Sequence, residues 1–193
     1  RSETYKSLEN NECIKLIEEI FNERFLLKFY KKIYKQIILS RPFDIFNLYT
    51  FLRKARFTNE NKKKSLFEKF FYSNFKYTYE FSYIFKDGYI NPHTDSKAKI
   101  ISILLYFPDR EQENLSIGTT FYKSKLKNFS NNSDIYNKNR EEFYNNVESK
   151  FTLKFKKKNL YCFIKSKYSW HAVEKINIPE DKVRKSININ LNI

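Results

Sequence analysis

The chain has 193 residues and a formal net charge of +15 at pH 7. Its 41% hydrophobic and 19% aromatic residues exclude a disordered chain, and the length suits a single domain, residues 1–193. Two cysteines are too few for a disulfide framework, and no apolar run approaches the roughly 20 residues that span a bilayer. Because no secretory leader is visible either, we expect a cytoplasmic protein without a membrane partner.

The basic charge raises the question of a nucleic-acid partner. The 37 basic residues comprise 29 lysines and 8 arginines, spread along the whole chain. A phosphate-binding surface favours arginine, which makes bidentate contacts. We interpret much of the excess of Lys, Asn, Ile, Phe and Tyr as the codon bias of a low-GC genome. Charge alone therefore does not favour nucleic acid.

Apolar spacing of three and four residues predicts a helical N-terminal part, residues 1–74. We expect a first helix at 7–39, ended by Arg41-Pro42, because the residue before proline avoids helical dihedral angles. Two shorter helices are expected at 43–55 and 63–71, with a polar loop at 58–62 between them.

The pattern then changes to that of strands. Alternating aromatic residues predict a strand over 75–85, and Asp87-Gly88 predicts a turn of the hairpin type. The polar insertion at 123–150 has a helical pattern only at 140–147. Helices followed by many strands indicate an α+β chain whose second part, 75–193, is a sandwich or jelly roll. The other predicted strands are 99–107, 118–122, 151–155, 160–165, 170–176 and 185–193.

The chain has only two histidines, His93 and His171. Asp95 follows His93 by two positions, so on extended backbone both side chains point to the same side. His171 lies on another predicted strand and can supply a third ligand. Two histidines and one carboxylate that leave coordination positions open are the ligands of non-haem Fe(II) oxygenases, where an organic cosubstrate and O2 bind.

A basic residue follows the second histidine. Arg184 lies 13 positions after His171, and Ser186 shares its face of the last predicted strand. A buried arginine beside a metal needs an anion, because an unpaired buried charge is very costly. A dicarboxylic cosubstrate meets that need through bidentate pairing.

These motifs occur together, in one order, over about residues 75–193. With them the sequence resembles the Fe(II)- and 2-oxoglutarate-dependent dioxygenase superfamily, in particular its prolyl-hydroxylase-like branch. The resemblance implies a double-stranded β-helix (jelly-roll) core with the N-terminal helices packed on one sheet. The matching blocks are Tyr-Ile-Phe-Lys-Asp-Gly-Tyr-Ile-Asn-Pro-His-Thr-Asp at 83–95, Ser-Ile-Leu-Leu-Tyr-Phe at 102–107, Gly-Thr-Thr-Phe-Tyr at 118–122, Ser-Trp-His-Ala-Val at 169–173 and Arg-Lys-Ser at 184–186.

The resemblance also assigns roles to single residues. It implies that iron is bound by His93, Asp95 and His171. Arg184 is expected to hold the distal carboxylate of 2-oxoglutarate, with the help of Ser186. We further expect the Tyr106 hydroxyl on that carboxylate and Tyr83 beside the cosubstrate near the metal. Of the remaining motif residues, Trp170 is expected to pack in the core and Gly118 to permit a close approach.

The reaction that the resemblance implies is hydroxylation of a C–H bond, coupled to decarboxylation of 2-oxoglutarate to succinate and CO2. The substrate is open between a protein or amino-acid side chain and a small metabolite, and so is the oligomeric state. Asp95 disfavours a halogenase, which has a small residue there. The nucleic-acid demethylases that resemble this template carry a second arginine six positions after the first. Here that position is Asn190, which disfavours a nucleic-acid-directed oxygenase. A catalytically silent jelly-roll binding module is disfavoured by the intact ligand set.

Overall fold

The computed structural model describes residues 15, 19–40, 54–58, 72–96, 98–113, 115–124, 140–166 and 168–192. The chain divides into two compact units, residues 1–76 and 77–193. This boundary lies close to residue 75, where the sequence pattern changes from helical to alternating. That residues 1–193 form one domain stays a prediction. Among the described helices, none is long and apolar enough to cross a membrane.

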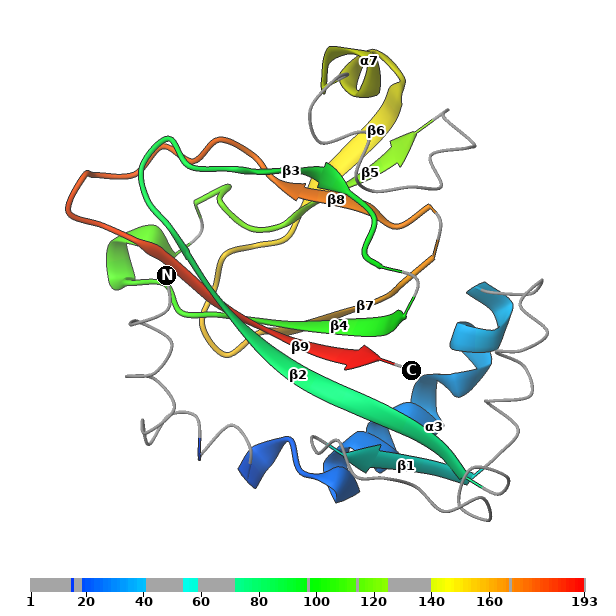
Figure 1. Cartoon of the computed structure of the whole chain (residues 1–193). Helices are drawn as coiled ribbons and strands as arrows, with labels where there is room; N and C mark the ends of the chain where they lie inside the picture. Colours follow the sequence, from blue (N-terminus) through cyan, green and yellow to red (C-terminus); the bar gives the residue numbers. More distant parts are fainter. Residues whose placement is uncertain are drawn as a thin grey trace. The chain divides into compact units, whose positions relative to one another are not determined.

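The first unit contains helix α3, Glu23–Ser40 (Figure 1). The predicted helix over 7–39 is confirmed from Glu23 onward, but it is not continuous, because residues 21 and 22 form a break. Asn22 caps the new start: its Oδ1 accepts a hydrogen bond of 3.0 Å from the Phe25 amide. Helix α3 buries Leu26, Tyr30 and Ile37, which share one face at helical spacing.

Strand β1, Lys54–Thr58, pairs in parallel with the start of β2, Tyr72–Ile84, and α3 packs against β1. The predicted helix over 43–55 is therefore wrong at its last two residues, since pairing with β2 overrides the local helical pattern. Its remainder, the predicted helix at 63–71 and all but the first residue of the loop at 58–62 lie outside the described residues.

The second unit is built from two antiparallel layers, which face each other in Figure 1. One layer has the order β2-β9-β4-β7, with β1 paired in parallel to the first-unit part of β2, and the other layer has the order β3-β8-β5-β6. This arrangement confirms the predicted jelly-roll core, and α3 on β1 confirms helical packing on a sheet. The strands are β3 Ile90–His93, β4 Lys99–Tyr106, β5 Thr120–Ser124, β6 Val147–Thr152, β7 Leu160–Ile164, β8 Trp170–Val173 and β9 Arg184–Asn192. A 3-10 turn, Arg110–Gln112, and a short helix, α7 Arg140–Asn145, complete the unit.

Burial explains most of the strand pattern. Most residues of the apolar run of β4 are buried, on both faces of this inner strand, which lies between β9 and β7 in its sheet. In β9 the faces differ: Ile187, Ile189 and Leu191 are buried on one side, whereas Arg184 and Ser186 lie on the other. The second face is the one that lines the cavity described below.

Three local predictions need correction. The turn at Asp87 exists, with the Gly88 amide donating to the Phe85 carbonyl at 2.9 Å, but it joins strands of different sheets and so is not a hairpin. The strand expected at 151–155 is β6, which ends at residue 152, because Phe155 leaves the sheet to fill the core between the layers. The helical pattern at 140–147 gives α7 only to residue 145.

Two packing predictions are confirmed. A Cβ atom on Gly118 would lie 2.0 Å from the Leu153 carbonyl oxygen, so this position allows the close approach of two backbone segments. Trp170 is 2% exposed, and its ring lies 5.0 Å from that of Phe143. Its role is packing on the β5-β8 side of the second unit.

Candidate metal centre

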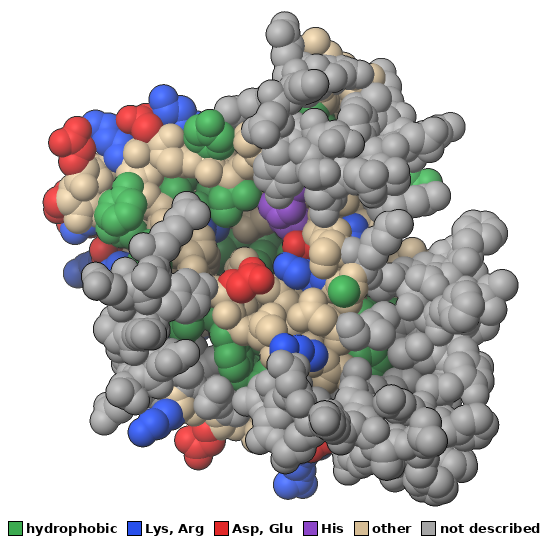
Figure 2. Space-filling view, viewed as in Figure 1, with side chains coloured by type: hydrophobic (Ala, Val, Ile, Leu, Met, Phe, Trp, Pro, Cys, Tyr) green, Lys and Arg blue, Asp and Glu red, His purple; other side chains and the backbone are tan. Residues whose placement is uncertain are grey.

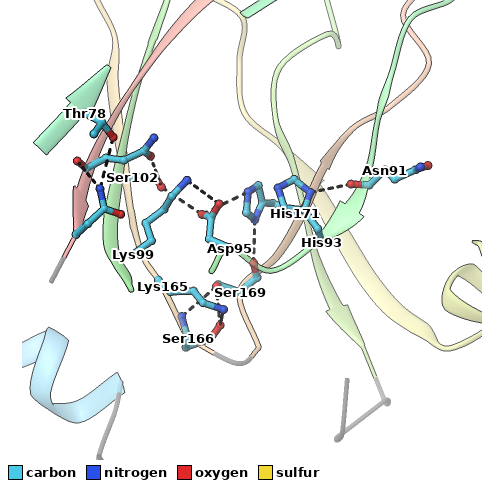
Figure 3. A network of polar contacts seen from close by, with 12 residues as sticks. Thr78, Asn91, His93, Asp95, Lys99, Ser102, Lys165, Ser166, Ser169 and His171 are labelled. Atoms are coloured by element: carbon cyan, nitrogen blue, oxygen red, sulfur yellow. Dashed lines mark hydrogen bonds and ion pairs between the residues drawn. The ribbon is translucent and has the colours of Figure 1, made fainter. Parts of the chain in front are cut away.

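The three proposed metal ligands converge at one end of β3 and β8. His93 and His171 face each other across these strands, with ring centroids 4.3 Å apart. Asp95 follows β3, and its Oδ2 lies 3.8 Å from His171 Nε2. One ligand atom from each of the three residues lies within 4.8 Å of the others. Figure 3 shows the three side chains next to one another. Within the described residues this is the one such group of ligating side chains.

Both histidines are held through the same ring nitrogen. His93 Nδ1 lies 2.8 Å from the Asn91 carbonyl oxygen, and His171 Nδ1 lies 2.9 Å from the Ser169 carbonyl oxygen. A carbonyl oxygen only accepts, so each Nδ1 carries the hydrogen. The lone pair of each imidazole is then at Nε2, as in metal sites in which a second group fixes the tautomer.

The charge states also suit a metal. Burial, together with the neighbouring His93, lowers the pKa of His171 to about 4, so this imidazole is neutral near pH 7. Burial alone would raise the pKa of Asp95, but attraction to His171 and the ion pair with Lys99 lower it. Neutral imidazole and ionised carboxylate are the forms that bind a metal ion.

Both carboxylate oxygens of Asp95 accept hydrogen bonds. Lys99 Nζ donates to Oδ1 at 2.7 Å, and Ser102 Oγ donates to Oδ2 at 3.2 Å. Ser102 Oγ is also 3.1 Å from Asn190 Oδ1, although it has a single hydrogen to donate. Exchanging the amide oxygen and nitrogen of Asn190 resolves this conflict, because the buried Nδ2, otherwise without a partner, then donates to Ser102.

The ligands open into a cavity of about 190 Å³ between the two layers. Figure 2 shows histidine in a hollow of this face, with charged side chains beside it. Arg184 and Ser186 line the same cavity. The sequence did not point to the other polar wall residues, since their positions depend on pairing between β2, β4 and β9. These residues are Glu80, Ser82, Lys99, Ser102, Thr119 and Asn188.

Arg184 is 1% exposed, and burial lowers its pKa. Its Nε donates to the Ile117 carbonyl oxygen at 2.6 Å, and its Nη1 donates to Ser186 Oγ at 3.2 Å. The guanidinium carbon lies 5.3 Å from the centre of the Tyr106 ring. No carboxylate of the described residues forms an ion pair with it. Among the residues that the structure describes, the site therefore contains a buried cation without an anion.

The two tyrosines that sequence reasoning added to the site differ in their placement. Tyr106 is buried, and its hydroxyl donates to Thr119 Oγ1 at 2.8 Å and accepts from the Thr119 amide at 2.9 Å. It contacts Arg184 through its ring, while Thr119 lines the cavity. Tyr83 is 46% exposed and is not part of the cavity wall. Alternation along β2 explains this, since Ser82 faces the cavity and Tyr83 the opposite side.

Comparison with known proteins gives one kind of match. No family model matches the chain, and no curated protein does. Among solved structures, the chain is similar to a prolyl-4-hydroxylase of Pseudomonas putida, at 12% identity and a TM-score of 0.36. The alignment covers 60% of this chain and 51% of that protein, so the chain spans about half of its length.

The geometry of the described residues defines the class of site. Two imidazoles and one carboxylate at the opening of a jelly roll form a candidate 2-His-1-carboxylate metal centre. The structure thus brings together the His-X-Asp…His ligand set that the sequence predicted.

Proposed function

We propose that this chain is an Fe(II)- and 2-oxoglutarate-dependent dioxygenase that hydroxylates a C–H bond and releases succinate and CO2. One observation carries the proposal: the ligand set His93, Asp95 and His171 shares a cavity with Arg184, a buried cation without an anion among the described residues. The ligand set would bind a redox-active metal ion, and Arg184 would bind a carboxylate of a dicarboxylic cosubstrate.

The donor set fits Fe(II). Two neutral imidazoles and one carboxylate suit this ion, and three protein ligands leave positions for a cosubstrate and O2. When bound, the iron supplies the redox chemistry that couples cosubstrate decarboxylation to C–H oxidation. The protein's part is to fix the imidazole tautomers through Asn91 and Ser169 and to hold the Asp95 carboxylate ionised.

Arg184 and Ser186 would bind the distal carboxylate of 2-oxoglutarate. Arg184 Nε and Nη1 are held by Ile117 and Ser186, which fixes the plane of the guanidinium. A carboxylate placed beside it forms charge-assisted hydrogen bonds and removes the cost of an unpaired buried charge. Thr119, on the same wall, is a further hydrogen-bonding group for the distal carboxylate. Tyr106 orients the Thr119 side chain through the hydrogen bond to its Oγ1.

The rest of the cavity wall would receive the substrate and exclude water. Ile90, Leu104, Phe163 and Val173 supply apolar surface near the ligands, and such surface limits access of water to a reactive centre. The polar residues of β2 and β9 form another part of the wall. The proposed substrate class is a protein or amino-acid side chain or a small metabolite.

The test is conversion of 2-oxoglutarate to succinate with added Fe(II), measured without substrate and then with candidate substrates. We expect turnover in the wild type and in Lys182→Met, a control that removes a lysine paired with Glu111. His93→Ala and Asp95→Ala should form no succinate. Unchanged turnover in both alanine variants would refute the proposal, whereas iron and 2-oxoglutarate binding without succinate in the wild type would indicate a binding module.

A further inference from the structure

We propose that Lys99 is a positioning residue that restricts Asp95 to binding the metal through a single oxygen, Oδ2. The inference rests on the proposed function, because it concerns the same metal centre. It adds a role for a residue that no motif of the sequence singles out, and it concerns the number of coordination positions that remain open.

The two oxygens of Asp95 have different surroundings. Oδ1 accepts the hydrogen bond of 2.7 Å from the Lys99 ammonium group. Oδ2 lies 3.8 Å from His171 Nε2, on the side where the imidazole lone pairs meet. Ser102, which lies on β4 as Lys99 does, donates to Oδ2 at 3.2 Å, a weaker contact that leaves that oxygen another lone pair. Figure 3 shows Asp95 between the ammonium group on one side and the imidazoles on the other.

Lys99 is itself held in place. It is the first residue of β4, its amide donates to the Ser96 carbonyl oxygen at 3.1 Å, and its backbone pairs with Asn192 of β9. Its side chain is 13% exposed and that of Asp95 is 9% exposed. A charge-assisted bond between two partly buried groups is stronger than a surface ion pair, and Lys99 is held by the backbone pairing of β4.

The consequence concerns the open positions. A carboxylate can bind a metal through one oxygen or through both, and the second mode occupies a further position. The proposed reaction needs positions for both 2-oxoglutarate and O2. With Oδ1 bonded to Lys99, Asp95 offers one oxygen and three of the six positions of an octahedral ion stay free. Without the ammonium group, Oδ1 is free to turn toward the metal and occupy one of them.

The experiment counts water molecules on bound Mn(II), used as a probe in place of iron. Water-proton relaxation is measured for the metal complexes of the wild type, Lys99→Met, Lys99→Arg and the control Lys182→Met. For Lys99→Met we expect the relaxivity of bound Mn(II) to fall by about one third, as three water positions become two. We also expect affinity for Mn(II) at least equal to that of the wild type, since a nearby cation is removed. Lys99→Arg, which keeps a cationic donor, should restore the wild-type relaxivity.

The inference is overturned by a relaxivity of Lys99→Met equal to that of the wild type, or by a loss of relaxivity that Lys99→Arg shares. In either case the wild-type complex would still stand as support for the proposed function. A wild type that binds no Mn(II) would instead overturn the proposed function together with the inference. A fall in Lys182→Met of the same size would also overturn the role of Lys99, because that lysine is paired with Glu111 and does not line the cavity.

Discussion

Replacing Arg184 with Gln should affect two quantities differently: the stability of the ligand-free protein and the affinity for 2-oxoglutarate. In the ligand-free protein the guanidinium is 1% exposed and has no carboxylate partner among the described residues. The neutral amide removes a buried charge but also the hydrogen bonds to Ile117 and Ser186. Because these two effects oppose each other, Arg184→Gln should change the free energy of unfolding by no more than about 3 kcal/mol. In the presence of metal and 2-oxoglutarate, the same change removes the proposed anchor of the distal carboxylate.

The magnitude follows from the contacts. A hydrogen bond to a charged group contributes about 1.5–3 kcal/mol, which corresponds to a loss of affinity of roughly 10- to 150-fold. The contact of Nε with Ile117 and that of Nη1 with Ser186 are made within the protein, so they do not add to this loss. Arg184→Lys keeps the charge but loses the planar pair of donors, and we expect an intermediate affinity.

The assay is anaerobic calorimetric titration of the Mn(II)-loaded protein with two ligands. The first is 2-oxoglutarate, and the second is 2-oxobutanoate, which lacks the distal carboxylate. Arg184→Gln should weaken binding of 2-oxoglutarate alone and bring both ligands to similar affinity. Equal weakening of both ligands would refute the reasoning, since it would place the effect on the metal end of the site. So would a large loss of stability in the ligand-free variant.

Three further predictions concern the fold around the site. In Gly118→Ala the added Cβ would lie 2.0 Å from the Leu153 carbonyl oxygen, so urea unfolding should show destabilisation of about 2 kcal/mol or more, and an unchanged midpoint would contradict the close approach. Tyr106→Phe leaves the Thr119 amide without its acceptor and should cost about 1–3 kcal/mol in the same assay; a neutral effect would mean that this bond is not formed. His171 has a pKa of about 4 in the folded protein, against 6.5 for an ordinary histidine. As the pH falls from 6.5 to about 4, the unfolded chain therefore takes up a proton that the folded chain does not. The free energy of unfolding of the metal-free protein should fall by up to about 3 kcal/mol over this range. His171→Asn should flatten that slope in urea unfolding measured from pH 7 to pH 4, and a slope equal to that of the wild type would count against a buried neutral imidazole.

The strands were the most predictable part of the fold. The apolar run of β4 follows from the burial of that strand, which local sequence records directly, and the alternation of residue types in β2 predicted a strand. Sequence could not show that Lys54 begins a strand, because β1 depends on its parallel partner β2. Nor could it show that the turn at Asp87 carries the chain from one sheet to the other, since a turn signal is the same in both cases.

The candidate site, like the fold, was predictable from the sequence only in part. His93, Asp95 and His171 are distinctive by residue type and order, and the structure brings them together. Lys99 and Ser102 are ordinary in a chain rich in lysine and serine, and their contacts with Asp95 arise from the turn before β4 and from the position of β4 within the sheet. The role of Tyr83 stays a prediction: this residue is exposed and outside the cavity wall, and sequence could not show which face of β2 meets the cavity.

The most direct measurement is the number of Fe(II) ions bound per chain under anaerobic conditions. For the wild type we predict saturable binding of one ion per chain. In Asp95→Ala and His171→Ala, checked by circular dichroism to be folded, this binding should be lost. Saturable binding that survives in both variants, or a wild type that binds no iron, would contradict the convergence of the two imidazoles and the carboxylate on one metal.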